Sequence, residues 1–114
     1  MRFLFSVFLS FFVLFFAGNN IVVAEEFSVD LDAGEQIFSQ RCVSCHAGGN
    51  NLVNPIKTLS IKDLNTYGKD SVKAIITQVT YGAQGMPVFR EILDEEDIVN
   101  VANYVLNQAQ NSSW

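Results

Sequence analysis

The sequence contains few thiol, thioether and imidazole side chains, and this scarcity narrows the metal chemistry open to it. It has two Cys, one His and two Met in 114 residues. A structural zinc site takes four ligands, commonly Cys and His, and the chain has only three such residues. Basic residues are also few, because seven Lys and Arg stand against twelve Asp and Glu. The resulting net charge of −5 argues against nucleic acid or anionic lipid as a partner.

Strand-like alternation of apolar and polar residues is absent, and no repeat or linker divides the chain, whose length suits one compact domain. Helical periodicity is present in four segments: residues 30–42, 60–67, 71–81 and 94–106. Asp30 is a suitable N-cap for the first of them, and Gly82 ends the third. Residues 47–54, rich in Gly and Asn, and residues 82–93 are predicted to be irregular. The predicted class is all-α.

The N-terminal segment differs in composition from the rest of the chain. Arg2 precedes an uncharged apolar run over residues 3–17, and the small residues Val22-Val23-Ala24 follow. This order is typical of a cleaved secretory signal peptide, residues 1–24. The alternative is an uncleaved membrane anchor, but the run is shorter than the about 20 residues that span a bilayer. Cleavage would leave a domain of residues 25–114 with no stable membrane insertion and a charge of −6.

Cys42, Cys45 and His46 form a C-x-x-C-H motif, the attachment sequence of c-type haem. Two cysteines at this spacing reach the two vinyl groups on one edge of a porphyrin, and the adjacent His is placed to bind the iron. A dithiol redox motif instead follows a strand in an α/β fold, and a disulfide across two residues would be strained. The motif predicts one covalently attached haem c, with Cys42 and Cys45 as its anchors and His46 as an iron ligand.

Met86 is the candidate for the opposite iron ligand, because residues 25–114 contain no other Met and no second His. Pro87 favours an extended backbone at Met86 and stiffens the loop that would hold the sulfur. The simpler interpretation is a Met that fills a gap in the core. Ligation by His and Met raises the reduction potential and closes the iron to small molecules. This pair therefore predicts electron transfer without bond chemistry, so the protein is not expected to be an enzyme.

These motifs and their flanking segments resemble the cytochrome c6 family of class I cytochromes c. The segments that carry the resemblance are DLDAGEQIF at 30–38, CVSCHAGGNN at 42–51, KTL at 57–59, Gln78-Val79, MPVF at 86–89, residues 97–98, residues 104–106 and Trp114. The resemblance implies a fold of about four helices wrapped around one covalent haem. It also implies a monomer that carries electrons from the cytochrome b6-f complex to photosystem I in the thylakoid lumen.

The resemblance assigns roles to further residues. The carbonyl of Pro55 would accept a hydrogen bond from the free ring nitrogen of His46, which fixes the tautomer. Lys57 would approach a haem propionate, and Gln78 would lie near the haem and tune its potential. Gly34 and Phe38 would meet Tyr104 on the last helix.

The chain departs from the family where partners would dock. Ile92 occupies the position of an Arg that the family uses toward photosystem I, and the nearest Arg is Arg90. Three alternatives stay open at this point. One is a periplasmic or lumenal carrier that donates to a terminal oxidase or another reductase. The second is a c-haem sensor with a labile sixth ligand, and the third is a dithiol protein without haem.

Overall fold

The computed structural model describes Val7 and residues 28–114. The predicted signal peptide lies outside these residues except for Val7, so the domain boundary at residue 24 stays a prediction. The elements are α2 (Leu31–Arg41), α3 (Val43–His46), the 3-10 turn η1 (Ala47–Gly49), α4 (Ile61–Thr66), α5 (Val72–Tyr81), the 3-10 turn η2 (Phe89–Glu91) and α6 (Glu95–Asn111). The described residues contain no strand, and the prediction of an all-α domain is confirmed.

Each of the four main helices begins at a side-chain cap. Asp30 accepts a hydrogen bond from the Ala33 amide at 3.0 Å, as its predicted role requires. The same contact is made at the start of α4, α5 and α6 by Ser60, Ser71 and Asp94. These caps explain why the helices start where the sequence predicts, since each satisfies an amide that the first turn would leave unpaired.

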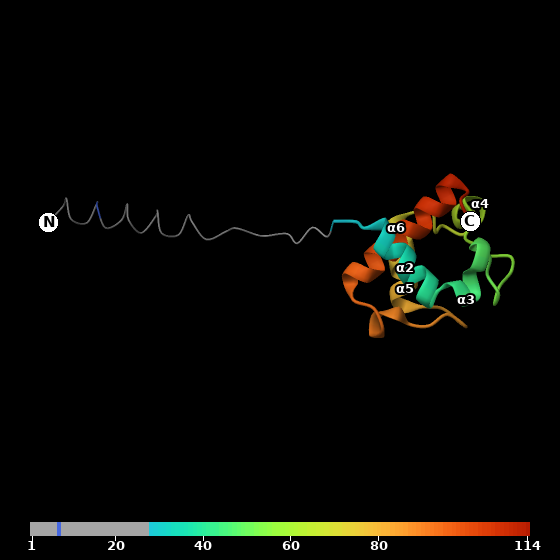
Figure 1. Cartoon of the computed structure of the whole chain (residues 1–114), viewed down its shortest axis with the longest axis horizontal. Coiled ribbons are helices and arrows are strands. Elements are labelled where there is room, and N and C mark those ends of the chain that lie inside the picture. The colour runs from blue at the N-terminus through green and yellow to red at the C-terminus, as the bar shows by residue number, and fades with distance from the viewer. Residues whose placement is uncertain (1–6, 8–27) are drawn as a thin grey trace.

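Helices α2 and α6 cross in direct contact (Figure 1). The crossing occurs at Gly34, where a Cβ atom would lie 2.3 Å from the carbonyl oxygen of Asn100. Phe38 is buried one turn further along, with its ring centroid 5.5 Å from that of Tyr104. The expected meeting of Gly34 and Phe38 with the last helix is therefore confirmed. Buried Asn100 also accepts a hydrogen bond from the Asp30 amide at 2.9 Å, which ties the start of α2 to α6.

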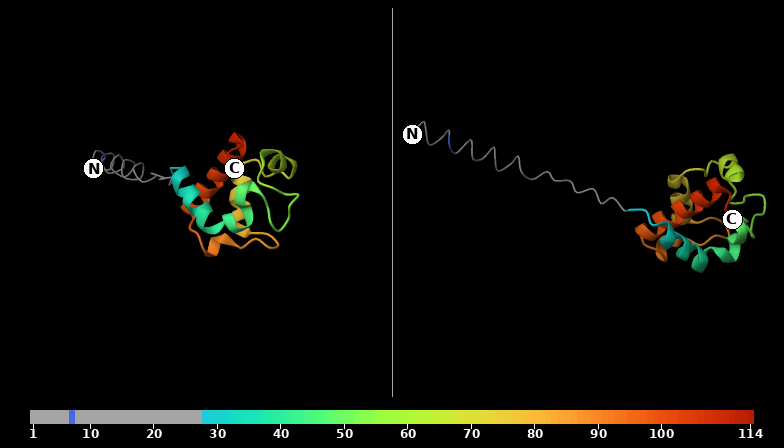
Figure 2. Two further views of the ribbon diagram at one scale, coloured as in Figure 1. Left: turned by 45° about the vertical axis from the view of Figure 1, so that its right-hand side comes forward. Right: turned by 45° about the horizontal axis from the view of Figure 1, so that its top comes forward.

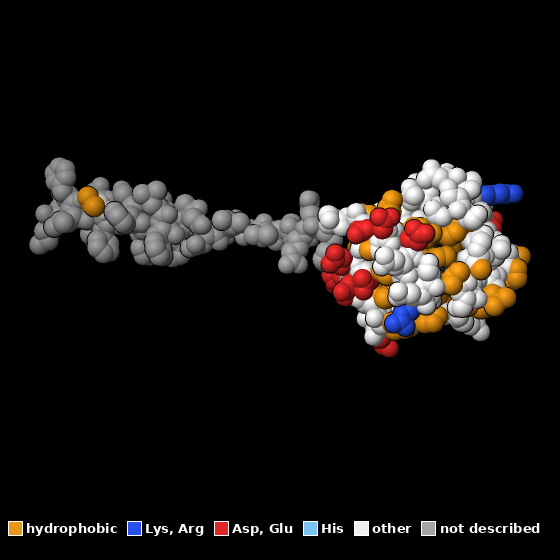
Figure 3. Space-filling view, in the orientation of Figure 1, with side chains coloured by type: hydrophobic (Ala, Val, Ile, Leu, Met, Phe, Trp, Pro, Cys, Tyr) orange, Lys and Arg blue, Asp and Glu red, His pale blue; other side chains and the backbone are white. Residues whose placement is uncertain are grey.

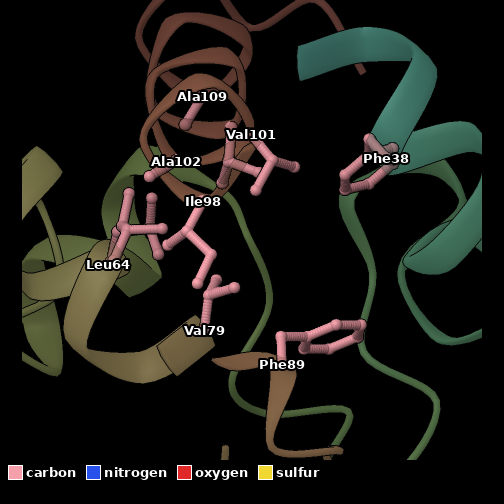
Figure 4. Packing of buried hydrophobic residues seen from close by; sticks show 10 residues of the cluster. Phe38, Leu64, Val79, Phe89, Ile98, Val101, Ala102 and Ala109 are labelled. Carbon is pink, nitrogen blue, oxygen red and sulfur yellow. The ribbon is translucent and has the colours of Figure 1, made fainter. Parts of the chain in front are cut away.

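The hydrophobic core is centred on α6, with contributions from α2, α4, α5 and η2 (Figure 4). Its buried members are Phe38, Leu64, Ile75, Val79, Phe89, Ile98, Val101, Ala102, Val105 and Ala109. Phe38 and Phe89 lie apart from the group around α6 in this view. Among the residues that pack partly buried against this core are Cys42 and Met86. The core and two of the predicted haem-site residues are thus in contact.

Three local features differ from the sequence-based expectation. Helix α2 ends at Arg41, and a separate turn, α3, carries the last four residues of the C-x-x-C-H motif, with Cys42 between the two. The two regions predicted to be irregular contain η1 and η2, and α6 extends to Asn111, beyond residue 106. None of the helices in the described part of the chain has the length and apolar character needed to cross a membrane.

Candidate haem-binding site

The two cysteines lie at the junction of α2 and α3. The Cys42 amide donates to the Phe38 carbonyl at 2.9 Å, so it closes α2, and the Cys42 carbonyl then accepts from the amides of Cys45 and His46. One helical turn therefore places the two thiols on the same side, with His46 next to them. Both cysteines are free thiols and both are half-buried. The predicted haem anchors are available to react.

Burial raises the pKa of the Cys42 thiol to about 11, with a smaller contribution from Cys45. The thiolate is the reactive form in disulfide exchange, and redox-active cysteines have a lowered pKa. Cys42 has the opposite shift. This argues against the dithiol alternative.

The ring of His46 is held by a backbone carbonyl. Its Nδ1 lies 2.8 Å from the carbonyl oxygen of Asn50. A carbonyl only accepts, so Nδ1 carries the proton and Nε2 has its lone pair available for a metal. The contact thus fixes the tautomer that iron ligation requires.

The prediction that Pro55 would supply this carbonyl is wrong. Gly48 and Gly49 have φ values of +64° and +73°, and they turn the chain back so that Asn50 lies beside the ring. Pro55 instead lies exposed in a later turn of the same loop. The signal that could have identified Asn50 is the Gly48-Gly49 pair directly before it, because positive φ at two successive residues reverses the chain sharply.

Met86 lies in a tight turn. The amides and carbonyls of Ala83 and Met86 are paired, at 3.2 and 3.0 Å, and Gly85 between them has a φ of +83°. A Cβ atom on Gly85 would lie 2.8 Å from Cγ1 of Val53. The Met86 turn therefore packs against the loop that follows His46, and both loops are visible at the same end of the domain in Figure 2. The turn that carries one predicted iron ligand thus packs against the loop directly after α3, which ends at the other, His46.

Gln78 and Lys57 have protein partners in the structure. The side-chain amide of Gln78 donates to the carbonyl of Gly82 at 2.9 Å, at the start of the segment that leads to Met86. The ammonium of Lys57 lies 4.9 Å from the ring centroid of Tyr67. Their roles toward haem stay predictions.

The position that the resemblance associates with partner docking also has a defined geometry. Ile92 is 46 % exposed, so the residue that replaces the family's Arg lies at the surface. The guanidinium of Arg90 lies over the ring of Tyr81, 5.5 Å from its centroid. Arg90 is thus held against a neighbouring aromatic side chain.

These residues fit a c-type haem. Two free thiols on one turn suit the two vinyl groups, and the available Nε2 of His46 and the thioether of Met86 are donors that iron accepts. Cys42 and Met86 both pack against the apolar core, where a porphyrin would be shielded from water.

The chain was compared with known proteins. A family model described as cytochrome c oxidase, cbb3-type, subunit III matches residues 29–105. Cytochrome c6 of Gracilaria tenuistipitata var. liui is 47 % identical over 111 residues, which cover 97 % of this chain and 98 % of the relative. Cytochrome c6 of Microcystis aeruginosa is 60 % identical over 77 residues, which cover 68 % of this chain and 95 % of the relative.

A solved structure gives the same result. Cytochrome c6 of the diatom Phaeodactylum tricornutum superposes with a TM-score of 0.71 at 48 % identity, covering 75 % of this chain and 99 % of that one. The relatives that align along nearly the whole chain are named cytochrome c6. The chain belongs to the cytochrome c6 family, with the class I cytochrome c fold and one covalently bound c-type haem.

Proposed function

We propose that this mono-haem electron carrier takes electrons from the cytochrome b6-f complex and delivers them to photosystem I in the thylakoid lumen. The observation that carries the proposal is the packing of the Met86 turn on the loop after His46. It supports a haem site with protein donors on both faces of the iron. A site closed in this way can pass electrons but has no open position for a substrate, so we propose no enzymatic activity.

Each side chain has a stated part in the site. Cys42 and Cys45 would anchor the haem through their sulfur atoms, and Nε2 of His46 and the thioether of Met86 would bind its iron. The haem, when bound, supplies an iron that accepts and releases one electron. The Asn50 carbonyl holds the His46 ring, and the backbone pairing of Ala83 with Met86 holds the Met86 turn. These contacts keep both donor side chains in place in the oxidised and the reduced protein.

The charge distribution supports a protein partner. Exposed acidic side chains gather where α2 and α6 begin (Figure 3), and they include Asp30, Asp32, Glu35, Asp94, Glu95 and Glu96. A surface of this sign attracts a positively charged partner and speeds the encounter. The secretory signal predicted at residues 1–24 supports delivery to the lumen, or to the periplasm in the alternative.

A second candidate is donation to a terminal oxidase, which the match to the cbb3-type oxidase subunit model favours. The two candidate functions are distinguished by the second-order rates at which the reduced holoprotein donates electrons to purified photosystem I and to a purified oxidase. We expect the faster rate with photosystem I. A faster rate with the oxidase would replace the proposal, and a high-spin visible spectrum would support the sensor alternative instead.

A further inference from the structure

The indole of Trp114 covers the backbone of Gly49. A Cβ atom on Gly49 would lie 2.4 Å from Cγ of Trp114, so the ring rests directly on the glycine. The indole Nε1–H donates to the carbonyl of Leu59 at 3.1 Å. One side chain therefore contacts two points of the chain that are ten residues apart.

These two points form the neck of the loop that follows His46. The Leu59 amide donates to the Gly49 carbonyl at 2.7 Å, which closes the loop of residues 49–59. The indole lies across this pairing. It also packs against Phe38, with ring centroids 5.3 Å apart, and edge-on against Tyr104 at 6.3 Å. Phe38 on α2 and Tyr104 on α6 thus hold the indole in place, and the indole in turn holds Gly49 and Leu59 together.

The neck is adjacent to the partner of the histidine. Gly49 precedes Asn50, whose carbonyl lies 2.8 Å from Nδ1 of His46. Asn50 is exposed, so water can compete for both ends of this hydrogen bond. The bond persists only if the backbone at Asn50 is held in place. The contacts of Asn50 itself do little for this, since its amide makes only a long bond, 3.2 Å, to the Ala47 carbonyl.

We propose that Trp114 is a positioning residue for His46. By pinning Gly49 and Leu59, it keeps the Asn50 carbonyl on Nδ1–H and so holds the ring in the orientation and tautomer that present Nε2. The inference rests on the proposed ligation by His46, and it adds a residue from the far end of the chain to the support of that ligand.

The test uses the haem-loaded protein in its reduced form and measures hydrogen exchange of the His46 ring Nδ1–H by NMR. In Trp114→Ala we expect exchange about tenfold faster, as loss of one net hydrogen bond gives. Trp114→Phe keeps a ring on Gly49 and should restore much of the protection. The Met86 methyl resonance reports the opposite face of the haem and should keep its shift in both variants.

Val101→Ala is the matched control. It removes volume from a fully buried site on α6 and leaves the indole in place, so we expect lower stability with the ring exchange unchanged. Equal exchange rates in Trp114→Ala and Val101→Ala would overturn the positioning role. A parent protein without a haem-shifted Met86 methyl resonance would instead overturn the proposed ligation by Met86, and the exchange comparison would still decide the role of Trp114.

Discussion

Gly34 lies so close to Asn100 that a single added carbon would reach 2.3 Å from the Asn100 carbonyl oxygen. Neither helix can accommodate a larger side chain at this point without moving. The short distance between α2 and α6 at their crossing therefore depends on residue 34 having a hydrogen atom where any other residue would have a Cβ atom.

Gly34→Ala should destabilise the protein, although Ala favours a helix by about 1 kcal/mol over Gly. The clash is with backbone atoms, which cannot rotate away, so we expect a net loss of about 1–3 kcal/mol. Denaturant unfolding of the holoprotein measures it. Ser39→Ala, an exposed change on the same helix, serves as the control and should stay within about 0.5 kcal/mol of the parent. An unchanged midpoint for Gly34→Ala would mean that the helices separate easily.

Asp63 should make stability depend on acid pH. Its carboxylate accepts hydrogen bonds from the hydroxyl and the amide of Thr58, and these lower its pKa. Because the folded pKa lies below the unfolded one, the stabilisation is present above the ordinary Asp range and is lost as the pH falls through the folded pKa. The free energy of unfolding should be measured from about pH 6 to about pH 2. As the pH falls, it should decrease less steeply for Asp63→Asn and for Thr58→Val than for the parent protein. Slopes identical to that of the parent would contradict this account.

Met86→Ala should lower the reduction potential by more than about 59 mV, which is a factor of ten for one electron. Loss of the thioether removes a ligand that favours the reduced iron, and water or carbon monoxide can then bind. Met86→His should keep six ligands and still lower the potential. Potentiometry and visible spectra distinguish the two variants. If Met86→Ala leaves spectrum and potential unchanged, Met86 only packs the core.

Electron transfer to a positively charged partner should slow as salt rises. Residues 25–114 carry a charge of −6, and the screening length falls from about 10 Å at 0.1 M salt to about 3 Å at 1 M. Stopped-flow rates across this range test the prediction, and Glu95→Gln with Glu96→Gln should flatten the dependence. A rate that climbs steadily with salt would show repulsion at the docking face.

Native protein should lack residues 1–24, because the apolar run is short and small residues precede Glu25. The intact mass should equal that of residues 25–114 plus one haem. A mass that retains Met1 would indicate a membrane-tethered carrier.

The start of each main helix could be predicted from the sequence because Asp30, Ser60, Ser71 and Asp94 act locally on the next turn. The two cysteines that anchor the haem could also be predicted from the sequence, because C-x-x-C-H is a contiguous motif that fits one helical turn.

The support of His46 could not be predicted in the same way. Which carbonyl reaches Nδ1 depends on the turn at Gly48 and Gly49, and the resemblance pointed to Pro55 instead of Asn50. The contact of Trp114 with Gly49 joins residues 65 positions apart, so no local pattern contains it.

The hydrogen bond from the Asp30 amide to Asn100 has a practical use. It marks the edge of the packed domain, since Ser28 and Val29, just before it, are exposed. A surface-coupling thiol or an affinity tag at these positions would leave α2 anchored to α6 and stand apart from the thiols, imidazole and thioether at the haem site. The carrier could then be attached to an electrode in one orientation, with its haem-site end facing solution.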